Sequence, residues 1–227
     1  MNIVVFTSEW NIKHAMAARL SLLLTLTIII LINSVGGLEN GKIKITVGTT
    51  AGCSDTVNFI TNQLLPTYRK YERFLEIEFV AWGRTRRENG VFTFCQFNAM
   101  NCWVNRMHRC SLDMMKGNQT RQLEFMSCEF SPPLPVILRE SYDCAISSGL
   151  NVVDVDFCLN NPHLDSLDDV AQEAAAEPVS AINFIPYIII NDNTDVNVHN
   201  QALRRLSSVI CFLLAEDPAS GVTECQI

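Results

Sequence analysis

Nine of the 227 residues are cysteines, and the way in which they oxidise decides which folds are open to the chain. An odd number leaves at least one thiol outside any set of intramolecular disulfides. In an oxidising compartment the other eight would form four disulfides, whereas in a reducing one they would be thiols or metal ligands. The fold therefore depends first on which cellular compartment the chain enters.

The first 36 residues have the three parts of a secretory signal peptide. Lys13 and Arg19 form a basic start, an apolar block follows at 20–32, and small residues at 34–37 suit cleavage. The apolar block is shorter than the ~20 residues that span a membrane. We expect cleavage near residue 36 and no stable membrane insertion afterwards; an uncleaved signal anchor is the alternative.

Entry into the secretory pathway favours oxidised cysteines in the mature domain, residues 38–227, which we expect to be secreted or lysosomal. The cysteines expected to pair are Cys95, Cys102, Cys110, Cys128, Cys144, Cys158, Cys211 and Cys225. Eight cysteines allow 105 pairings, so spacing does not decide the partners. Cys211 lies in an apolar stretch, where a buried free thiol is the alternative.

Asn118-Gln119-Thr120 is a sequon for N-glycosylation. The motif has meaning only in a chain that enters the secretory pathway. We expect a glycan on Asn118, in an exposed loop.

The net charge of −7 disfavours nucleic acid as a partner, because nucleic-acid affinity depends on neutralising phosphates with basic residues. Arg84, Arg86 and Arg87 form a short basic run, which we interpret as a solvated loop. An anion or partner site there is the alternative.

Hydrophobic periodicity predicts a β-α-β unit at the start of the mature domain. Residues 42–47 alternate polar and apolar, and so do residues 75–79, which indicates two strands. Between them, apolar residues recur at helical spacing from Thr56 onward, and Pro66 should kink that helix. The apolar positions of the helix are Val57, Ile60, Leu64, Tyr68 and Tyr71.

Residues from about 92 to 177 hold six cysteines and mixed helical and loop patterns, which predicts a largely helical insertion. Its last helix should bury Leu164, Leu167, Val170 and Ala174. Residues 187–190 then predict a buried strand. A short strand through Val196 and Val198 should follow, and then a helix with an apolar face at Leu203, Leu206, Ile210 and Leu213.

Cys53 stands where the first strand gives way to the helix. The unpaired N–H groups and the macrodipole of a helix N-terminus stabilise an anion, and so favour the nucleophilic thiolate form of a cysteine. Asp55 places a carboxylate that opposes the thiolate. A β-α-β unit of this kind is typical of thioredoxin-like folds, in which a cis-proline lies against the active-site cysteine. We expect Ile185-Pro186 to be that bond.

Five residues of the insertion, Cys95, Gln96, Cys102, Asn105 and Cys110, match the spacing C-Q-H-G-x-x-x-C-x-x-N-x-x-x-x-C. In this pattern the chain resembles the gamma-interferon-inducible lysosomal thiol reductase (GILT) family. Residues 61–68 and 77–80 are similar to that family too, and the similarity extends over about 42–211. The resemblance implies an α/β, thioredoxin-like fold with a disulfide-stapled, largely helical insertion. It also implies reduction of protein disulfides in an acidic endosomal or secreted setting, without a cofactor.

The chain departs from the family where the chemistry takes place. The family's C-x-x-C is here Cys53-Ser54-Asp55-Thr56, and Phe97 and Asn98 replace the His-Gly of the signature. The second cysteine of a dithiol site resolves the mixed disulfide, which Thr56 cannot do. Its hydroxyl can donate a hydrogen bond to the Cys53 thiolate. We therefore predict a thiol–disulfide oxidoreductase with Cys53 as its single nucleophile, Thr56 and Pro186 beside it, and a small-molecule thiol completing turnover.

Several other readings of these residues stay open. Cys53 can be an inert relic or a structural cysteine, in which case the chain is a non-catalytic binding module on the same scaffold. A zinc site at Cys95, Cys102, His108 and Cys110 lacks the usual short cysteine spacing. A cysteine protease using His163 or His199 has no marked orienting residue.

Overall fold

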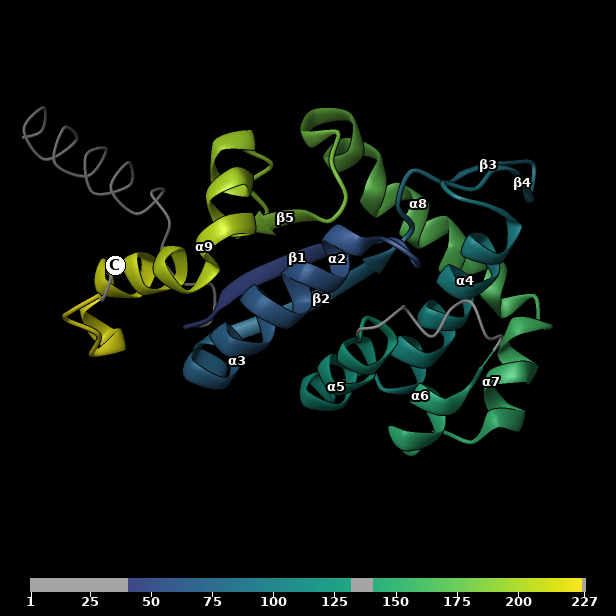
Figure 1. Cartoon of the computed structure of the whole chain (residues 1–227), viewed down its shortest axis with the longest axis horizontal. Helices are drawn as coiled ribbons and strands as arrows, with labels where there is room; N and C mark the ends of the chain where they lie inside the picture. Colours follow the sequence, from purple (N-terminus) through teal and green to yellow (C-terminus); the bar gives the residue numbers. More distant parts are fainter. Residues whose placement is uncertain (1–40, 132–140, 226–227) are drawn as a thin grey trace, which may run out of the picture. The chain divides into compact units, whose positions relative to one another are not determined.

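The computed structural model describes residues 41–131 and 141–225, so the predicted signal peptide lies outside the described residues. Three strands form the central sheet, in the order β2-β1-β5 (Figure 1). The middle strand β1 (Ile43–Thr49) pairs in parallel with β2 (Leu75–Ala81) and antiparallel with β5 (Tyr187–Ile190). Within the described ranges, no helix is long and apolar enough to cross a membrane.

Strand β1 is buried along nearly its whole length, as its central place requires. The predicted core residues Ile43, Ile45 and Val47 are all fully buried. Gly48 packs against the ring of Tyr187 on β5, and a Cβ at this position would lie 2.0 Å from ring atoms. Only glycine lets the two strands pair here.

The crossover from β1 to β2 is helical: α2 (Ser54–Phe59), the π-helical η1 (Ile60–Leu64), α3 (Leu65–Tyr71) and the 3-10 turn η2 (Glu72–Phe74). Pro66, where a kink is predicted, does not interrupt the helical crossover. Pro66 lies in the first turn of α3, and the π-helical segment directly before it accommodates its missing N–H, with the Leu65 N–H bonding to Ile60 O.

Between β2 and β5 the residues that the structure describes form a small hairpin and then five helices. They are β3 (Arg86–Glu88), β4 (Val91–Phe94), α4 (Ala99–Met114), α5 (Gln119–Glu129), α6 (Asp143–Ser147), α7 (Val152–Leu159) and α8 (His163–Ile182). Helices α4 to α7 gather to one side of the sheet (Figure 1). The predicted fold class is confirmed: an α/β, thioredoxin-like fold with a disulfide-stapled, largely helical insertion.

The eight cysteines predicted to pair form four disulfides in the structure. They are Cys95–Cys102, Cys110–Cys158, Cys128–Cys144 and Cys211–Cys225. The first three join parts of the insertion, and the fourth ties the last helix to the C-terminal segment. Cys211 is thus bonded rather than a buried free thiol.

The buried face predicted for α8 is right at Leu164, but Val170 and Ala174 are exposed and the positions one residue later are buried instead. Val170 is 66% exposed, and the buried residues of the helix are Leu164, Asp168, Ala171, Ala175, Pro178 and Ile182. The face differs because Asp168 is fully buried among arginines. Its carboxylate bonds to Arg109 and lies 3.2 Å from Nε of Arg106 and 3.7 Å from Nε of Arg87.

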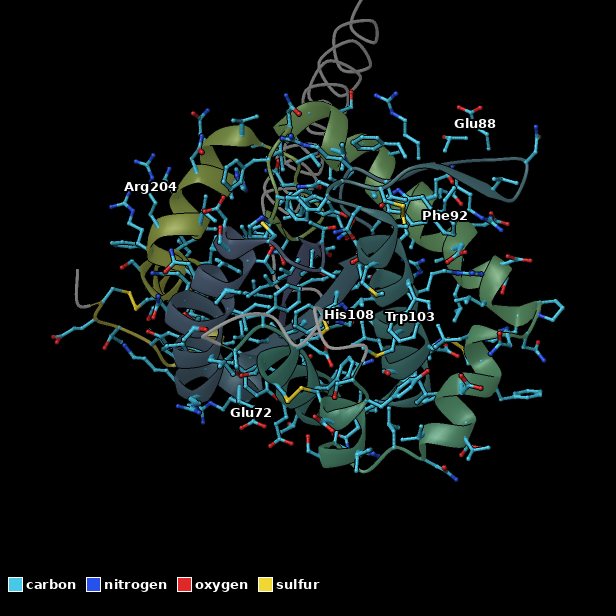
Figure 2. All side chains as sticks on the ribbon, turned by 45° about the vertical axis from the view of Figure 1, so that its right-hand side comes forward. Glu72, Glu88, Phe92, Trp103, His108 and Arg204 are labelled. Carbon is cyan, nitrogen blue, oxygen red and sulfur yellow. A yellow bond between two sulfur atoms is a disulfide. The ribbon has the colours of Figure 1, made fainter. Side chains whose placement is uncertain are left out.

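The solvated loop predicted at the arginine run is wrong for Arg87. Its side chain is only 6% exposed, and it donates hydrogen bonds to Asp165 and Asp169 at 2.7 and 2.6 Å. Arg84 and Arg86 are exposed. Arg87 therefore fastens the hairpin to α8, and Cζ of its guanidinium lies 5.9 Å from the centroid of the Phe92 ring. Phe92 is labelled in Figure 2.

Val196 and Val198 lie in a helix, not in the predicted strand. Helix α9 (Val196–Ala215) begins at Asp195, whose side chain accepts hydrogen bonds from the N–H groups of Asn197 and Val198. This N-cap outweighs the short alternation of valines. The predicted apolar face is shifted too, because the helix buries Ala202, Leu206, Ile210 and Leu214 while Leu203 and Leu213 are half-buried.

Helix α9 is interrupted at Arg205, which has non-helical angles (φ −150°, ψ 52°). The N–H of the next residue, Leu206, donates to Oε1 of Gln63 at 3.1 Å. Gln63 belongs to the π-helical segment η1. Two helical irregularities far apart in the sequence therefore meet at one hydrogen bond.

Candidate functional site

A tight turn between β1 and α2 carries Cys53. The N–H of Cys53 donates to Thr50 O at 3.2 Å, which closes a four-residue turn. Gly52, the third residue of the turn, has φ +81°, a conformation that glycine adopts without a Cβ clash. Cys53 is the N-cap residue of α2, as predicted, and has extended angles (φ −81°, ψ 116°).

Cys53 and Pro186 lie together, although they are far apart in the sequence. The Ile185-Pro186 peptide bond is cis, and the Cys53 thiol donates to Ile185 O over 3.5 Å. Cys53 is 5% exposed and is the one free cysteine in the part of the chain that the structure describes. The structure thus brings Cys53 against the carbonyl that precedes the predicted cis-proline.

The apolar surroundings of Cys53 come from β2, α8 and β5. Its cluster includes Val80, Trp82, Ala175 and Tyr187. Burial raises the pKa of the Tyr187 hydroxyl, and Glu78 raises it further, so this group stays neutral. Tyr187 therefore supplies no charge to the thiol.

Thr56 is fully buried, and its Oγ1 has no hydrogen-bond partner among the described residues. The hydrogen bond predicted from this hydroxyl to Cys53 is not present. The position that would hold a resolving cysteine is therefore an enclosed hydroxyl. Asp55, on the same turn, is exposed, so water screens its carboxylate from the thiol.

Two asparagines of α4 bind the turn before Cys53. Asn105 accepts from the N–H of Ala51 at 2.8 Å, and Asn101 donates to Ala51 O at 2.6 Å. Both also donate to Oγ1 of Thr50, at 3.1 and 2.9 Å. In the sequence, Asn105 stands out only through its spacing from the cysteines, and Asn101 does not stand out at all. Their i, i+4 spacing, which places two amides on one helix face, is the signal that could have identified the pair.

The residues considered for a zinc site or a protease have other partners. Cys95, Cys102 and Cys110 are in disulfides, and His108 bonds to Glu129 at 3.1 Å in the interior of the insertion (Figure 2). Within residues 41–131 and 141–225, no group of three potential ligands could hold a metal.

The two histidines of the protease reading have no hydrogen bond to Cys53. His163 lies 3.3 Å from Asp113 on the surface. Nδ1 of His199 accepts from the N–H of Ile188 at 3.2 Å. Neither ring is therefore placed to act as a base for the thiol.

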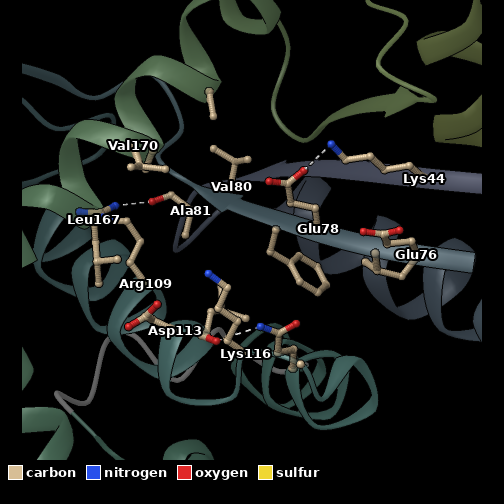
Figure 3. Close-up of a pocket in the computed structure, with 17 residues that line it drawn as sticks. Lys44, Glu76, Glu78, Val80, Ala81, Arg109, Asp113, Lys116, Leu167 and Val170 are labelled. Carbon is tan, nitrogen blue, oxygen red and sulfur yellow. Dashed lines mark hydrogen bonds and ion pairs between the residues drawn. The ribbon is translucent and has the colours of Figure 1, made fainter. Parts of the chain in front are cut away.

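A cavity of about 550 Å³ follows the outer edge of β2, between α4 and α8 (Figure 3). Arg109 closes one end by donating to Ala81 O, and Lys44 and Glu78 form an ion pair near the other. Burial lowers the pKa of Arg109 to about 10, with neighbouring arginines adding to the effect and Asp168 opposing it. Cys53 does not line this cavity, so we do not assign the thiol chemistry to it.

The predicted glycosylation site is exposed and lies at the end of the short loop between α4 and α5. Asn118 is the N-cap of α5 and accepts from the N–H of Arg121 at 3.1 Å through its oxygen. Thr120 lies in the first helical turn, 2.9 Å from the hydroxyl of Tyr68. The glycan itself remains a prediction.

Comparison with known proteins points to the family that the sequence resembles. The sequence pattern of the family described as gamma interferon inducible lysosomal thiol reductase (GILT) matches residues 44–146. GILT-like protein 1 of Drosophila melanogaster is 24% identical over 193 residues, covering 78% of this chain and 77% of that protein. GILT-like protein 2 of the same organism is 20% identical over 194 residues, covering 84% and 89%.

Among solved structures, a putative protein disulfide isomerase from Nitrosomonas europaea is similar over 68% of this chain and 87% of that chain, with 10% identity and a TM-score of 0.48. The family assignment rests on the sequence matches and on the agreement of strand, turn and cis-proline with the expected site. These sequence matches support membership of the GILT family of thiol reductases, with Cys53-Ser54-Asp55-Thr56 in place of C-x-x-C.

Proposed function

We propose that the protein is a thiol–disulfide oxidoreductase that reduces protein disulfides with Cys53 as its single nucleophile. One observation carries the proposal: the free cysteine lies at the strand-to-helix turn, against the carbonyl that precedes the cis-proline. A secreted or lysosomal location, after removal of the signal peptide, agrees with the four disulfides.

The reaction begins when the Cys53 thiolate attacks one sulfur of a substrate disulfide. The substrate S–S bond breaks, a mixed disulfide forms at Cys53, and the other substrate sulfur leaves as a thiolate that takes a proton. A small-molecule thiol, as its thiolate, then attacks Cys53 Sγ and releases the second substrate sulfur. A second small thiol attacks the resulting adduct, which frees Cys53 and leaves one oxidised small-molecule disulfide.

Replacement of the resolving cysteine makes the second step slow. An intramolecular thiol can act at an effective concentration of ~10⁵ M or more, and Thr56 provides none. Mixed disulfides should therefore be long-lived, and turnover should depend on the concentration of the external thiol.

The alternative is a non-catalytic binding module on the same scaffold. The burial of Cys53, which is 5% exposed, favours it, because a nucleophile must reach a substrate sulfur. Alkylation and adduct formation distinguish the two functions, since a binding module does not require a reactive thiol.

The test is to incubate the mature protein with an unfolded, disulfide-bearing protein at pH ~5 and pH ~7 and to measure the mixed disulfide by mass. We expect an adduct that Cys53→Ser abolishes. Thr56→Cys should release it and gain reductase activity, because residue 56 lies one turn after Cys53. Ser54→Cys is the matched control, since it adds a thiol at an exposed position one residue on and should not release the adduct.

Absence of a Cys53-dependent adduct in the wild type, together with no activity of Thr56→Cys at either pH, would establish the binding module instead. Equal gains from Ser54→Cys and Thr56→Cys would contradict the role given to position 56.

A further inference from the structure

We infer that Asn101 and Asn105 are positioning residues that hold the turn carrying Cys53 in the conformation that directs its thiol toward Ile185 O. The inference deepens the proposed function and rests on it, because it concerns the placement of the proposed nucleophile. Neither asparagine hydrogen-bonds Cys53 itself, so both act through the turn.

The two side chains hold a single residue of the turn from both ends. Asn105 accepts from the N–H of Ala51, and Asn101 donates to the carbonyl of the same residue, at 2.8 and 2.6 Å. Oγ1 of Thr50 lies between them and accepts from both amides. The arrangement uses the acceptor of one asparagine and the donor of the other, so the two amides are not equivalent.

The carbonyl that Asn101 holds belongs to the central peptide of the turn from Thr50 to Cys53. The two common turn types differ by a flip of this peptide, and the type with a glycine of positive φ in third place matches Gly52 at +81°. A hydrogen bond to Ala51 O therefore selects one of the two orientations. Cys53 follows directly, so its Sγ depends on that choice.

Burial makes the arrangement hard to replace. Thr50, Ala51, Asn101 and Asn105 are each at most 1% exposed. Without its acceptor, the N–H of Ala51 would be a buried donor without a partner, which is costly in a folded protein.

Helix α4 is itself well anchored. The disulfides Cys95–Cys102 and Cys110–Cys158 fix it, and Asn98 caps it by accepting from the N–H of Asn101 at 3.1 Å. The asparagines are therefore presented by a rigid element, which a positioning role requires.

The first experiment compares Asn101→Leu and Asn105→Leu with Gln119→Leu. Gln119 is a matched control, because its side-chain amide also makes two hydrogen bonds to backbone: it accepts from Ile77 N at 2.6 Å and donates to Leu75 O at 3.2 Å. Both bonds are at the start of β2, at the end of the strand away from the turn that carries Cys53. The substitution leaves the Asn118 sequon intact. We measure the second-order rate of Cys53 adduct formation at pH ~5 and pH ~7, and the melting temperature.

Both asparagine variants should lower the adduct rate by ~10-fold or more, since a misplacement of about 1 Å can cost 100-fold. Gln119→Leu should lose melting temperature but keep the wild-type rate. Equal rate losses in all three variants would show general loosening and overturn the inference, as would unchanged rates in both asparagine variants.

Aspartate distinguishes positioning from space filling. Asn105→Asp keeps the acceptor for Ala51 N and should retain most of the rate, whereas Asn101→Asp turns a carboxylate toward Ala51 O and should behave like Asn101→Leu. A role in packing alone predicts no such order, and equal effects of the two aspartates would contradict the inference.

Hydrogen exchange separates failure of this inference from failure of the proposed function. The amides of Ala51 and Cys53 should exchange faster in Asn105→Leu than in the wild type or Gln119→Leu. If the wild type forms no Cys53 adduct, the proposed function is overturned. The hydrogen-exchange rates of Ala51 and Cys53 then show whether the asparagines still hold the turn. Unchanged exchange in Asn105→Leu overturns that hold in either case.

Discussion

The sheet that carries Cys53 and the helical insertion beside it are held together by different means. No disulfide joins residues of β1, β2 or β5, whose stability comes from buried apolar strands and close packing. The insertion has three disulfides and the buried Asp168, whose carboxylate is met by Arg106, Arg109 and, from the hairpin, Arg87. The proposed thiol site therefore lies on the part of the fold that no disulfide stabilises. The two asparagines that bind its turn come from α4, which two disulfides hold in place.

The largest effect should come from Asp168→Ala. Removing this carboxylate leaves Arg109 and Arg87 without their buried partner, which typically costs about 3–5 kcal/mol of unfolding free energy. Asp169→Ala is the control, because Asp169 bonds the same Arg87 but is 72% exposed, and its loss should cost no more than ~1 kcal/mol. Denaturant unfolding measures both, and equal losses would show that burial of the charge is not what matters.

Removing the Cys110–Cys158 disulfide should come next. The bond closes the longest loop of the four, with a sequence separation of 48, against 7 for Cys95–Cys102. A double alanine variant should lose about 2–4 kcal/mol, and the short disulfide should contribute less. Thermal unfolding gives the order, and the reverse order would count against loop length as the cause.

Gly48→Ala tests how much the close packing of β1 against β5 contributes to stability. The new Cβ would collide with the buried ring of Tyr187, and overpacking of this kind costs about 1–3 kcal/mol. Gly117→Ala is the control, since a Cβ there meets nothing within 4 Å, although its positive φ adds strain. A loss no larger at position 48 than at 117 would contradict the close packing of β1 and β5.

The smallest effect concerns His199, which is 2% exposed. Burial lowers its pKa below the ordinary 6.5, so the unfolded chain takes up the proton first as the pH falls. Its contribution to stability is therefore complete above about pH 6.5 and declines in more acidic solution. His199→Asn keeps an acceptor for Ile188 N and should remove this part of the pH dependence in unfolding at pH ~5 and pH ~7; an unchanged profile would show that another group is responsible.

The sequence predicted what local patterns determine. Alternation located β1 and β2, a short apolar run located β5, and the strand-to-helix transition placed Cys53 at the start of α2. The hairpin of β3 and β4 was missed, although Asn89-Gly90 at its turn is a strong hairpin signal and both residues have positive φ.

What could not be predicted depends on residues distant in the sequence. The wrong face of α8 follows from Asp168, whose burial is possible only because Arg106 and Arg109 of α4 meet it. In a single helix, an aspartate among apolar residues indicates the solvent side. The hydrogen bonds from Asn101 and Asn105 to the turn likewise join residues about 50 positions apart, and no periodicity in the sequence reveals them.

The hydrogen bond from Leu206 N to Gln63 predicts how this family should vary. The interruption at Arg205 deprives one N–H of its helical acceptor, and a side chain from another helix takes that place. Relatives with the same interruption should therefore have glutamine or another acceptor at position 63. Relatives whose last helix is continuous should be free to vary there, so the two positions should change together in evolution.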